Sequence, residues 1–220
     1  MISPVSTASS GTTSPIIKVL ATFFSWVFHP LFIGLYMCLY IVYLQPDYFI
    51  GVSKFTKLQT ILIYVVNSIF FPLISVLLCK ALGFIDSIYL NTRKDRILLY
   101  TICMIYFFWN FYVFRNKSAT PPIIATMALG IFLAIVLAFI ANIYFKISMH
   151  AIGVGGMIGF FTVLLYASPA FVSLPLAVAI LIAGITCTSR LLIADHNMAD
   201  IFLGFIAGFI SQWIAAWFLG

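Results

Sequence analysis

Repeated apolar stretches of about 20 residues, almost without charge, constrain this chain more than any other feature. Hydrophobic residues fill 64% of its 220 positions and charged residues only 7%. Such stretches match the hydrocarbon thickness of a bilayer, and this composition excludes a soluble domain. The runs are continuous and lack the period of two that a membrane barrel requires, so each span should be helical. We therefore predict an all-α, polytopic transmembrane helical bundle.

The apolar runs divide the chain into a short tail and seven candidate spans. Residues 1–15 are rich in Ser and Thr, and we expect a disordered tail without cleavage. The first run contains His29-Pro30, where proline should kink the helix and give either a tilted span or a re-entrant hairpin. We expect an N-terminal unit over 16–57 and a six-span domain over 58–220. The runs cover residues 16–44, 58–82, 97–114, 121–145, 147–166, 175–194 and 198–219.

The segment 189–200 gathers polar and charged groups between two apolar runs. Ionisable groups are costly next to lipid, so this cluster indicates chemistry. His196 and Asp200 are four residues apart and would share one face of a helix, where the carboxylate can hold one imidazole nitrogen. Asp195 is adjacent to His196 and is less suited to that pairing. Arg190 is a natural clamp for an anion.

Two further groups of polar residues are predicted to lie on the same membrane face as this segment. One is the loop that holds Arg93, Lys94 and Arg96, and the other is the junction with Lys146, Ser148 and His150. Counting spans places all three groups on one side, which indicates a single site. The opposite side has neither a histidine nor a carboxylate pair, and it offers Asp47, Lys54, Lys57, Arg115 and Lys117.

These residues carry a resemblance to a known family. Ser189, Arg190, His196 and Asp200 fill the pattern S-R-x5-H-x3-D, which resembles the third signature motif of the type 2 phosphatidic acid phosphatase superfamily. The segment I-S-M-H at 147–150 keeps the Ser and His of the second signature, P-S-G-H, and lacks its Pro and Gly. The first signature, K-x6-R-P, has no full counterpart. Its cations could come from Arg93, Lys94, Arg96 or Lys146.

The resemblance covers about 58–219 and implies a phosphatase core of six helices, to which the first apolar run is an addition. It implies that His196 is the nucleophile, that Asp200 orients it, and that His150 is the general acid. No metal or other cofactor is implied. The phosphate-binding residues that it implies are Arg190, Ser148, Ser189, Lys146, Arg93, Lys94 and Arg96.

The expected substrate is a lipid phosphate or pyrophosphate, of the phosphatidic acid, phosphatidylglycerol phosphate or isoprenoid pyrophosphate class. Short loops favour a substrate that arrives by lateral diffusion in the bilayer. The cations are dispersed over both faces, which argues against nucleic acid and favours an anionic headgroup as partner. The resemblance implies the cytoplasmic (inner) membrane of a bacterium, with the site facing the outer side.

Other functions stay open at this point. A lipid phosphotransferase of the same fold would use the same residues, and a transporter could use the ionisable groups as a relay. A non-catalytic lipid-binding protein is a further alternative. His29 is interpreted as a packing residue beside the kink and is left out of the site. Glycines in the fifth and last spans predict close helix packing, within one chain or between two, so the oligomeric state is open.

Overall fold

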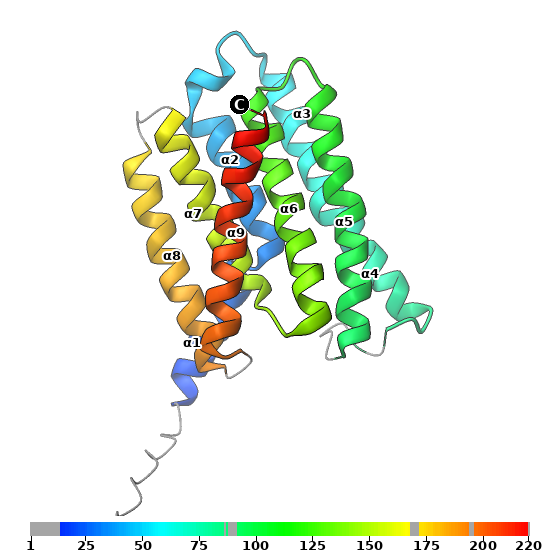
Figure 1. The fold of residues 1–220 in the computed structure, drawn as a ribbon. Helices are drawn as coiled ribbons and strands as arrows, with labels where there is room; N and C mark the ends of the chain where they lie inside the picture. The colour runs from blue at the N-terminus through cyan, green and yellow to red at the C-terminus, as the bar shows by residue number, and fades with distance from the viewer. Residues whose placement is uncertain (1–13, 86, 88–91, 168–171, 194–195, 220) are drawn as a thin grey trace, which may run out of the picture.

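The computed structural model describes residues 14–85, 87, 92–167, 172–193 and 196–219. Over these residues the chain is a bundle of helices without strands (Figure 1), so the all-α prediction is confirmed. Six helices are long and apolar enough to cross a membrane, which is consistent with an integral membrane protein. The α-helices are α1 (Pro15–Val27), α2 (Pro30–Leu44), α3 (Lys54–Val65), α4 (Phe71–Ala81), α5 (Arg93–Asn116), α6 (Pro122–Tyr144), α7 (Met149–Ala167), α8 (Ser173–Leu192) and α9 (Met198–Leu219).

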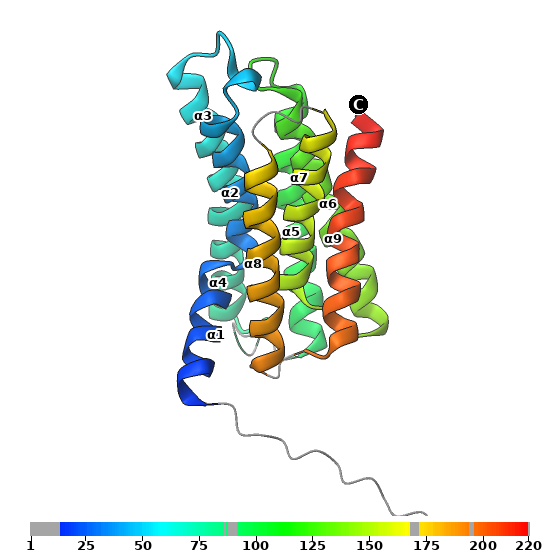
Figure 2. The ribbon, with the colours of Figure 1, turned by 90° about the vertical axis from the view of Figure 1, so that its left-hand side faces the viewer.

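The first apolar run is broken where the sequence predicts a kink. α1 and α2 are bent by 55° relative to each other. His29 caps the second half, since its Nδ1 accepts a hydrogen bond from the Leu31 N–H at 3.3 Å, and Pro30 begins α2. In Figure 2, α1 lies beside the lower part of α8, and α2 continues toward the opposite end of the bundle. This path favours a bent span over a re-entrant hairpin.

The core of the bundle is built on glycine contacts between α7 and α9. A Cβ atom at Gly208 would collide with the backbone of Ile152 and Gly156, and one at Gly155 would collide with the backbone of Phe205. The two backbones therefore touch, as small residues permit in membrane helix pairs. This contact shows that the glycine faces pack within one chain.

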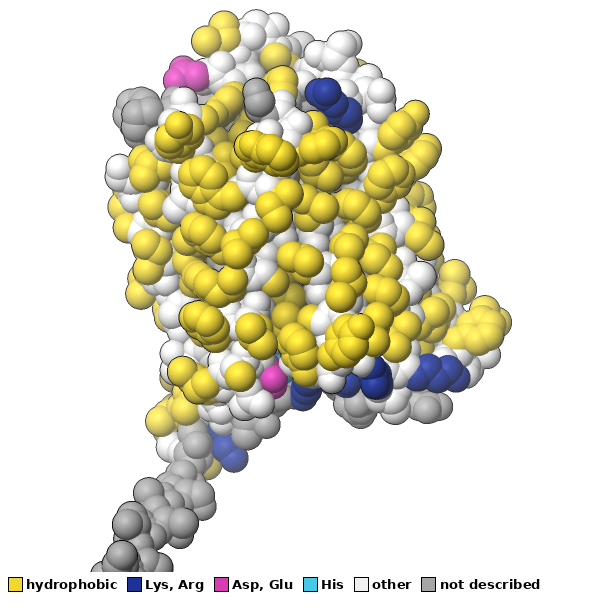
Figure 3. Space-filling view, in the orientation of Figure 1, with side chains coloured by type: hydrophobic (Ala, Val, Ile, Leu, Met, Phe, Trp, Pro, Cys, Tyr) yellow, Lys and Arg dark blue, Asp and Glu magenta, His cyan; other side chains and the backbone are white. Residues whose placement is uncertain are grey.

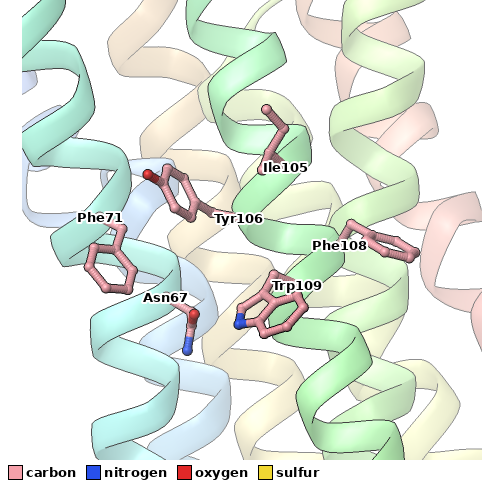
Figure 4. Close-up of a pocket in the computed structure, with 6 residues that line it drawn as sticks. All are labelled: Asn67, Phe71, Ile105, Tyr106, Phe108 and Trp109. Carbon is pink, nitrogen blue, oxygen red and sulfur yellow. The ribbon is translucent and has the colours of Figure 1, made fainter.

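On the side of the bundle formed by α3, α4 and α5, the helices are joined by a π-helix and polar side chains instead of glycine contacts. A π-helix, Val66–Phe70, joins α3 to α4 near the middle of one long span. Asn67 in this turn donates from Nδ2 to the Ile63 carbonyl at 2.8 Å, and the buried Asn110 donates to the Ser68 hydroxyl at 2.9 Å. Beside it, an open groove of about 420 Å³ lies between this span and α5 (Figure 4). Its lining residues are Asn67, Phe71, Ile105, Tyr106, Phe108 and Trp109.

The three polar groups singled out in the sequence lie at one end of the bundle. In Figure 1, α5, α7 and α9 begin at the lower end, where α6 and α8 finish. Figure 3 shows a broad apolar belt, with dark blue Lys and Arg side chains gathered near its lower and upper edges. The arrangement agrees with the prediction made by counting spans.

Candidate active site

The start of α9 holds His196 against Asp200. Asn197 caps the helix: its Oδ1 accepts from the Asp200 N–H at 2.8 Å, and Asp200 Oδ2 accepts from the Asn197 N–H at 3.2 Å. This reciprocal cap places the same carboxylate oxygen 3.4 Å from His196 Nδ1. The two side chains are only 8% and 13% exposed.

The pairing of His196 with Asp200 forms for a different reason from the one expected. The spacing predicts two residues on one face of a helix, but α9 begins at Met198, so His196 precedes the helix. The capping turn at Asn197, rather than the helical repeat, brings the imidazole to the carboxylate. The expectation about the helix face was wrong, although the two groups do meet.

The start of α7 is tied directly to the start of α9. The Ser148 N–H donates to the backbone carbonyl of Asp200 at 3.2 Å. Ser148 is fully buried, and its hydroxyl accepts from the Ala151 N–H at 3.4 Å, as the first turn of α7 requires. Gly204 permits this approach, because a Cβ there would lie 2.8 Å from the Ser148 carbonyl oxygen. The structure thus gives Ser148 a capping role, and its predicted contact with phosphate stays a prediction.

His150 is directed toward the N-terminal segment. Its Nε2 lies 3.1 Å from the carbonyl oxygen of Ser25 in α1. The ring of His29 packs against it at right angles, with 5.4 Å between ring centroids. His29 packs beside the kink, as expected from the sequence. The residue on which it packs is His150, which belongs to the candidate site. In the sequence, the feature that could have indicated this contact was a third histidine beside the expected break in the helix.

Arg190 lies near the end of α8 and joins this group by its charge. Its positive charge acts on both His29 and His150, and its Nε is shielded from solvent. Ser189 does not point the same way: its buried hydroxyl donates to the Ile185 carbonyl at 2.8 Å within the helix. The predicted phosphate contact of Ser189 therefore competes with an internal hydrogen bond.

The other cations predicted for the site, on α5 and before α7, lie at the same end of the bundle, where they bind the end of α6 or are exposed. Arg93 and Arg96 both hold the end of α6, donating from Nε to the backbone and side-chain oxygens of Asn142 at 3.1 and 3.0 Å. Lys94 and Lys146 are exposed. Asp195 lies outside the described residues.

The composition of the cluster suits an anion better than a cation. His196 lies against the Asp200 carboxylate, His29 packs on His150, and Arg190 and His196 act on His150 by their charge. Among these described residues one guanidinium offsets one carboxylate, so the local charge is positive whenever an imidazole is protonated. Within the described part of the chain, no three His, Cys, Asp or Glu side chains are grouped closely enough to hold a metal ion. The groove in Figure 4 lies elsewhere, and its lining residues include no Lys, Arg, His, Asp or Glu.

Comparisons of the chain with protein-family models, with curated proteins and with solved structures found no match in any of the three.

Proposed function

We propose that this protein is an integral membrane lipid phosphatase that hydrolyses a lipid phosphate or pyrophosphate through a phosphohistidine intermediate. The observation that carries the proposal is the shielded pair of His196 and Asp200 at the same end of the bundle as His150 and Arg190. A positioned imidazole supplies the nucleophile, and a nearby guanidinium supplies charge stabilisation. The resemblance of 189–200 to a phosphatase motif agrees with these roles.

In the first half of the reaction, His196 takes the phosphoryl group. Its Nδ1 faces the Asp200 carboxylate, which stabilises positive charge on the ring, and Nε2 attacks phosphorus. The bond from phosphorus to the leaving oxygen breaks, and His150 gives that oxygen a proton. The leaving oxygen is the ester oxygen of a lipid phosphate or the bridging oxygen of a lipid pyrophosphate. Arg190 offsets the charge on the phosphoryl oxygens. Water then attacks phosphorus and gives a proton to His150, which is neutral after the first half. The N–P bond breaks, inorganic phosphate leaves, and both imidazoles return to their starting states.

The location of the cluster supports a lipid as substrate. The starts of α7 and α9 and the finish of α8 lie at one end of the bundle (Figure 1), so a headgroup can reach the cluster while the tail stays in the bilayer. Transfer of an acyl or isoprenyl tail into water would cost about 0.8 kcal/mol for each methylene. In keeping with the resemblance, we place the protein in a bacterial inner membrane with this end on the outer side.

The test is phosphate release by the purified protein in detergent micelles, offered lipid phosphates and pyrophosphates without added metal. We expect His196→Ala to lower the rate at least about 10³-fold and Arg190→Ala roughly 10²-fold. The exposed Arg115 at the opposite end is the matched control, and Arg115→Ala should leave the rate unchanged.

The intermediate gives a second, independent reading. Rapid quenching with a ³²P-labelled substrate should trap an acid-labile phosphoprotein that is absent from His196→Ala. Full activity of a folded His196→Ala protein would contradict the proposal. Binding of these lipids without any release would instead favour a non-catalytic lipid-binding protein.

A further inference from the structure

The chain contains only three histidines. The ring of His29 contacts that of His150, and His196 lies close enough to act on His150 by its charge. His150 comes from α7 and His196 from the turn before α9, inside the region that resembles the phosphatase core. His29 comes from the break between α1 and α2, outside that region, and its ring contacts His150 directly. An N-terminal addition to the core therefore reaches the residue proposed as general acid.

The contacts of His150 define which nitrogen carries its proton. A backbone carbonyl only accepts hydrogen bonds, so Nε2 of His150 must donate to the Ser25 oxygen that lies 3.1 Å away. In the neutral ring the other nitrogen, Nδ1, is then an acceptor, and it is the atom that gains or loses a proton at the site. The tautomer is set by α1, which packs against α8.

His29 is itself fixed by the helix break. Its Nδ1 accepts from the Leu31 N–H, so this nitrogen carries no proton, and the following Pro30 prevents α1 from continuing smoothly into α2. The ring is thereby presented edge-on to His150, with an interplanar angle of 85°. The charged and titratable groups that act on His150 are Arg190 of α8, His29 of the break and His196 before α9.

We propose that the break between α1 and α2 is a positioning element of the active site. The Ser25 carbonyl and the His29 ring together hold His150 with its proton on Nε2. When the ring takes up a second proton on Nδ1, His150 delivers this second proton to the leaving oxygen. The inference rests on the proposed function for the last step, whereas the tautomer of His150 stands on the contacts alone.

Two substitutions separate the two duties of His29. His29→Asn keeps an acceptor for the Leu31 N–H and removes the ring from His150. His29→Phe keeps a ring against His150 and removes the cap. Phe32 packs on His29, with 6.2 Å between ring centroids, so Phe32→Leu is the control for general loosening of the break.

The tautomer is measured by NMR on full-length protein labelled with ¹⁵N in its histidine rings, where His150→Gln assigns the signals among three rings. We expect one dominant tautomer for His150, protonated on Nε2, in the unaltered protein, in Phe32→Leu and in His29→Phe. His29→Asn should give a mixture of tautomers. A His150 ring protonated on Nδ1, or mixed in the unaltered protein, would overturn the proposal whatever the activity.

The kinetic arm uses the same variants and the preferred lipid. His29→Asn should lower kcat roughly tenfold, a part of the 10²- to 10⁴-fold that a general acid supplies, with KM unchanged. The alkaline limb of its pH–rate profile should move, while His29→Phe and Phe32→Leu keep the original limb. An unmoved limb in His29→Asn would overturn the positioning role. If the unaltered protein releases no phosphate from any lipid, the proposed function fails, and the NMR result alone decides the role of the break.

Discussion

Two helix pairs of this bundle are packed by opposite means. α7 meets α9 through glycines, with backbone against backbone, and the buried share of the most apolar stretch is 61% in α7 and 33% in α9. The span from α3 to α4 meets α5 through aromatic side chains and a π-helix, and only 22% of its most apolar stretch is buried. The first pair is packed backbone to backbone, and the second leaves more of its apolar surface exposed.

The difference agrees with the position of the proposed phosphatase site. A phosphoryl transfer site needs its groups held within about 0.5 Å, which a backbone contact achieves better than flexible side chains. The histidines of the α7–α9 pair stand at its two helix starts, and the bond from the Ser148 N–H to the Asp200 carbonyl joins them. The other pair borders an open groove that is lined mostly by aromatic rings, as suits an adaptable apolar surface.

The largest effect should come from the charge at the start of α9. Asp200→Asn keeps an oxygen for the Asn197 N–H and removes the negative charge beside His196 Nδ1. We expect phosphate release to fall roughly 10³-fold, equivalent to about 4 kcal/mol in the barrier. Thermal unfolding in detergent should change little, because the cap survives. A rate within twofold of the unaltered protein would show that the pair has no catalytic part.

The next effect tests the backbone contact itself. Gly208→Ala forces a methyl group into the backbone of Ile152, and we expect a loss of about 3 kcal/mol in the free energy of unfolding, measured by thermal or denaturant unfolding in detergent. Gly184→Ala in α8 is the matched control, since a Cβ there meets nothing within 4 Å. It should be neutral or stabilising by about 0.5 kcal/mol. Equal effects of the two substitutions would mean that the α7–α9 contact is not tight.

The spans, the helix break and the close packing of α7 on α9 could be predicted from the sequence, because each is marked by residues that are near one another in the chain. Apolar length marks the spans, proline marks the break at His29-Pro30, and glycine spacing marks the packed faces. Counting spans then places 93–96, 146–150 and 189–200 at one end. The pairing of His196 with Asp200 also followed from spacing, although the helix start at Met198 gives it another cause.

The rest depended on contacts between distant segments, which spacing does not encode. Nothing local shows that His29 reaches His150, because that contact depends on how α1 packs beside α8. Ser148 and Ser189 match motif positions, and each hydroxyl forms a hydrogen bond within its own helix, so their contact with phosphate stays a prediction. The π-helix and its groove likewise arise from how one span meets α5.

A smaller effect is expected in the open pair. Asn110 is buried and donates to Ser68, while its Oδ1 has no hydrogen-bond partner among the described residues. Asn110→Leu, Ser68→Ala and the double variant form a cycle whose coupling energy should be about 0.6 kcal/mol, the average for hydrogen bonds between membrane helices. Unfolding in detergent measures it. A coupling above about 2 kcal/mol would make this pair as rigid as the glycine pair, and the comparison would fail.

The smallest effect should come from removing one hydroxyl group, that of Tyr106, from the wall of the groove. Tyr106 forms a hydrogen bond with Ser75 at 3.0 Å, and its ring stacks on Phe71 with 5.5 Å between centroids (Figure 4). Tyr106→Phe removes the hydroxyl and keeps the ring, so the free energy of unfolding should fall by about 0.5 kcal/mol. Tyr106→Ala also removes the stacking and should cost about 1 kcal/mol more. If Tyr106→Phe instead reduced phosphate release, the open pair would be coupled to the proposed site. The division of the bundle into a half that holds the proposed site and an adaptable half would then have to be abandoned.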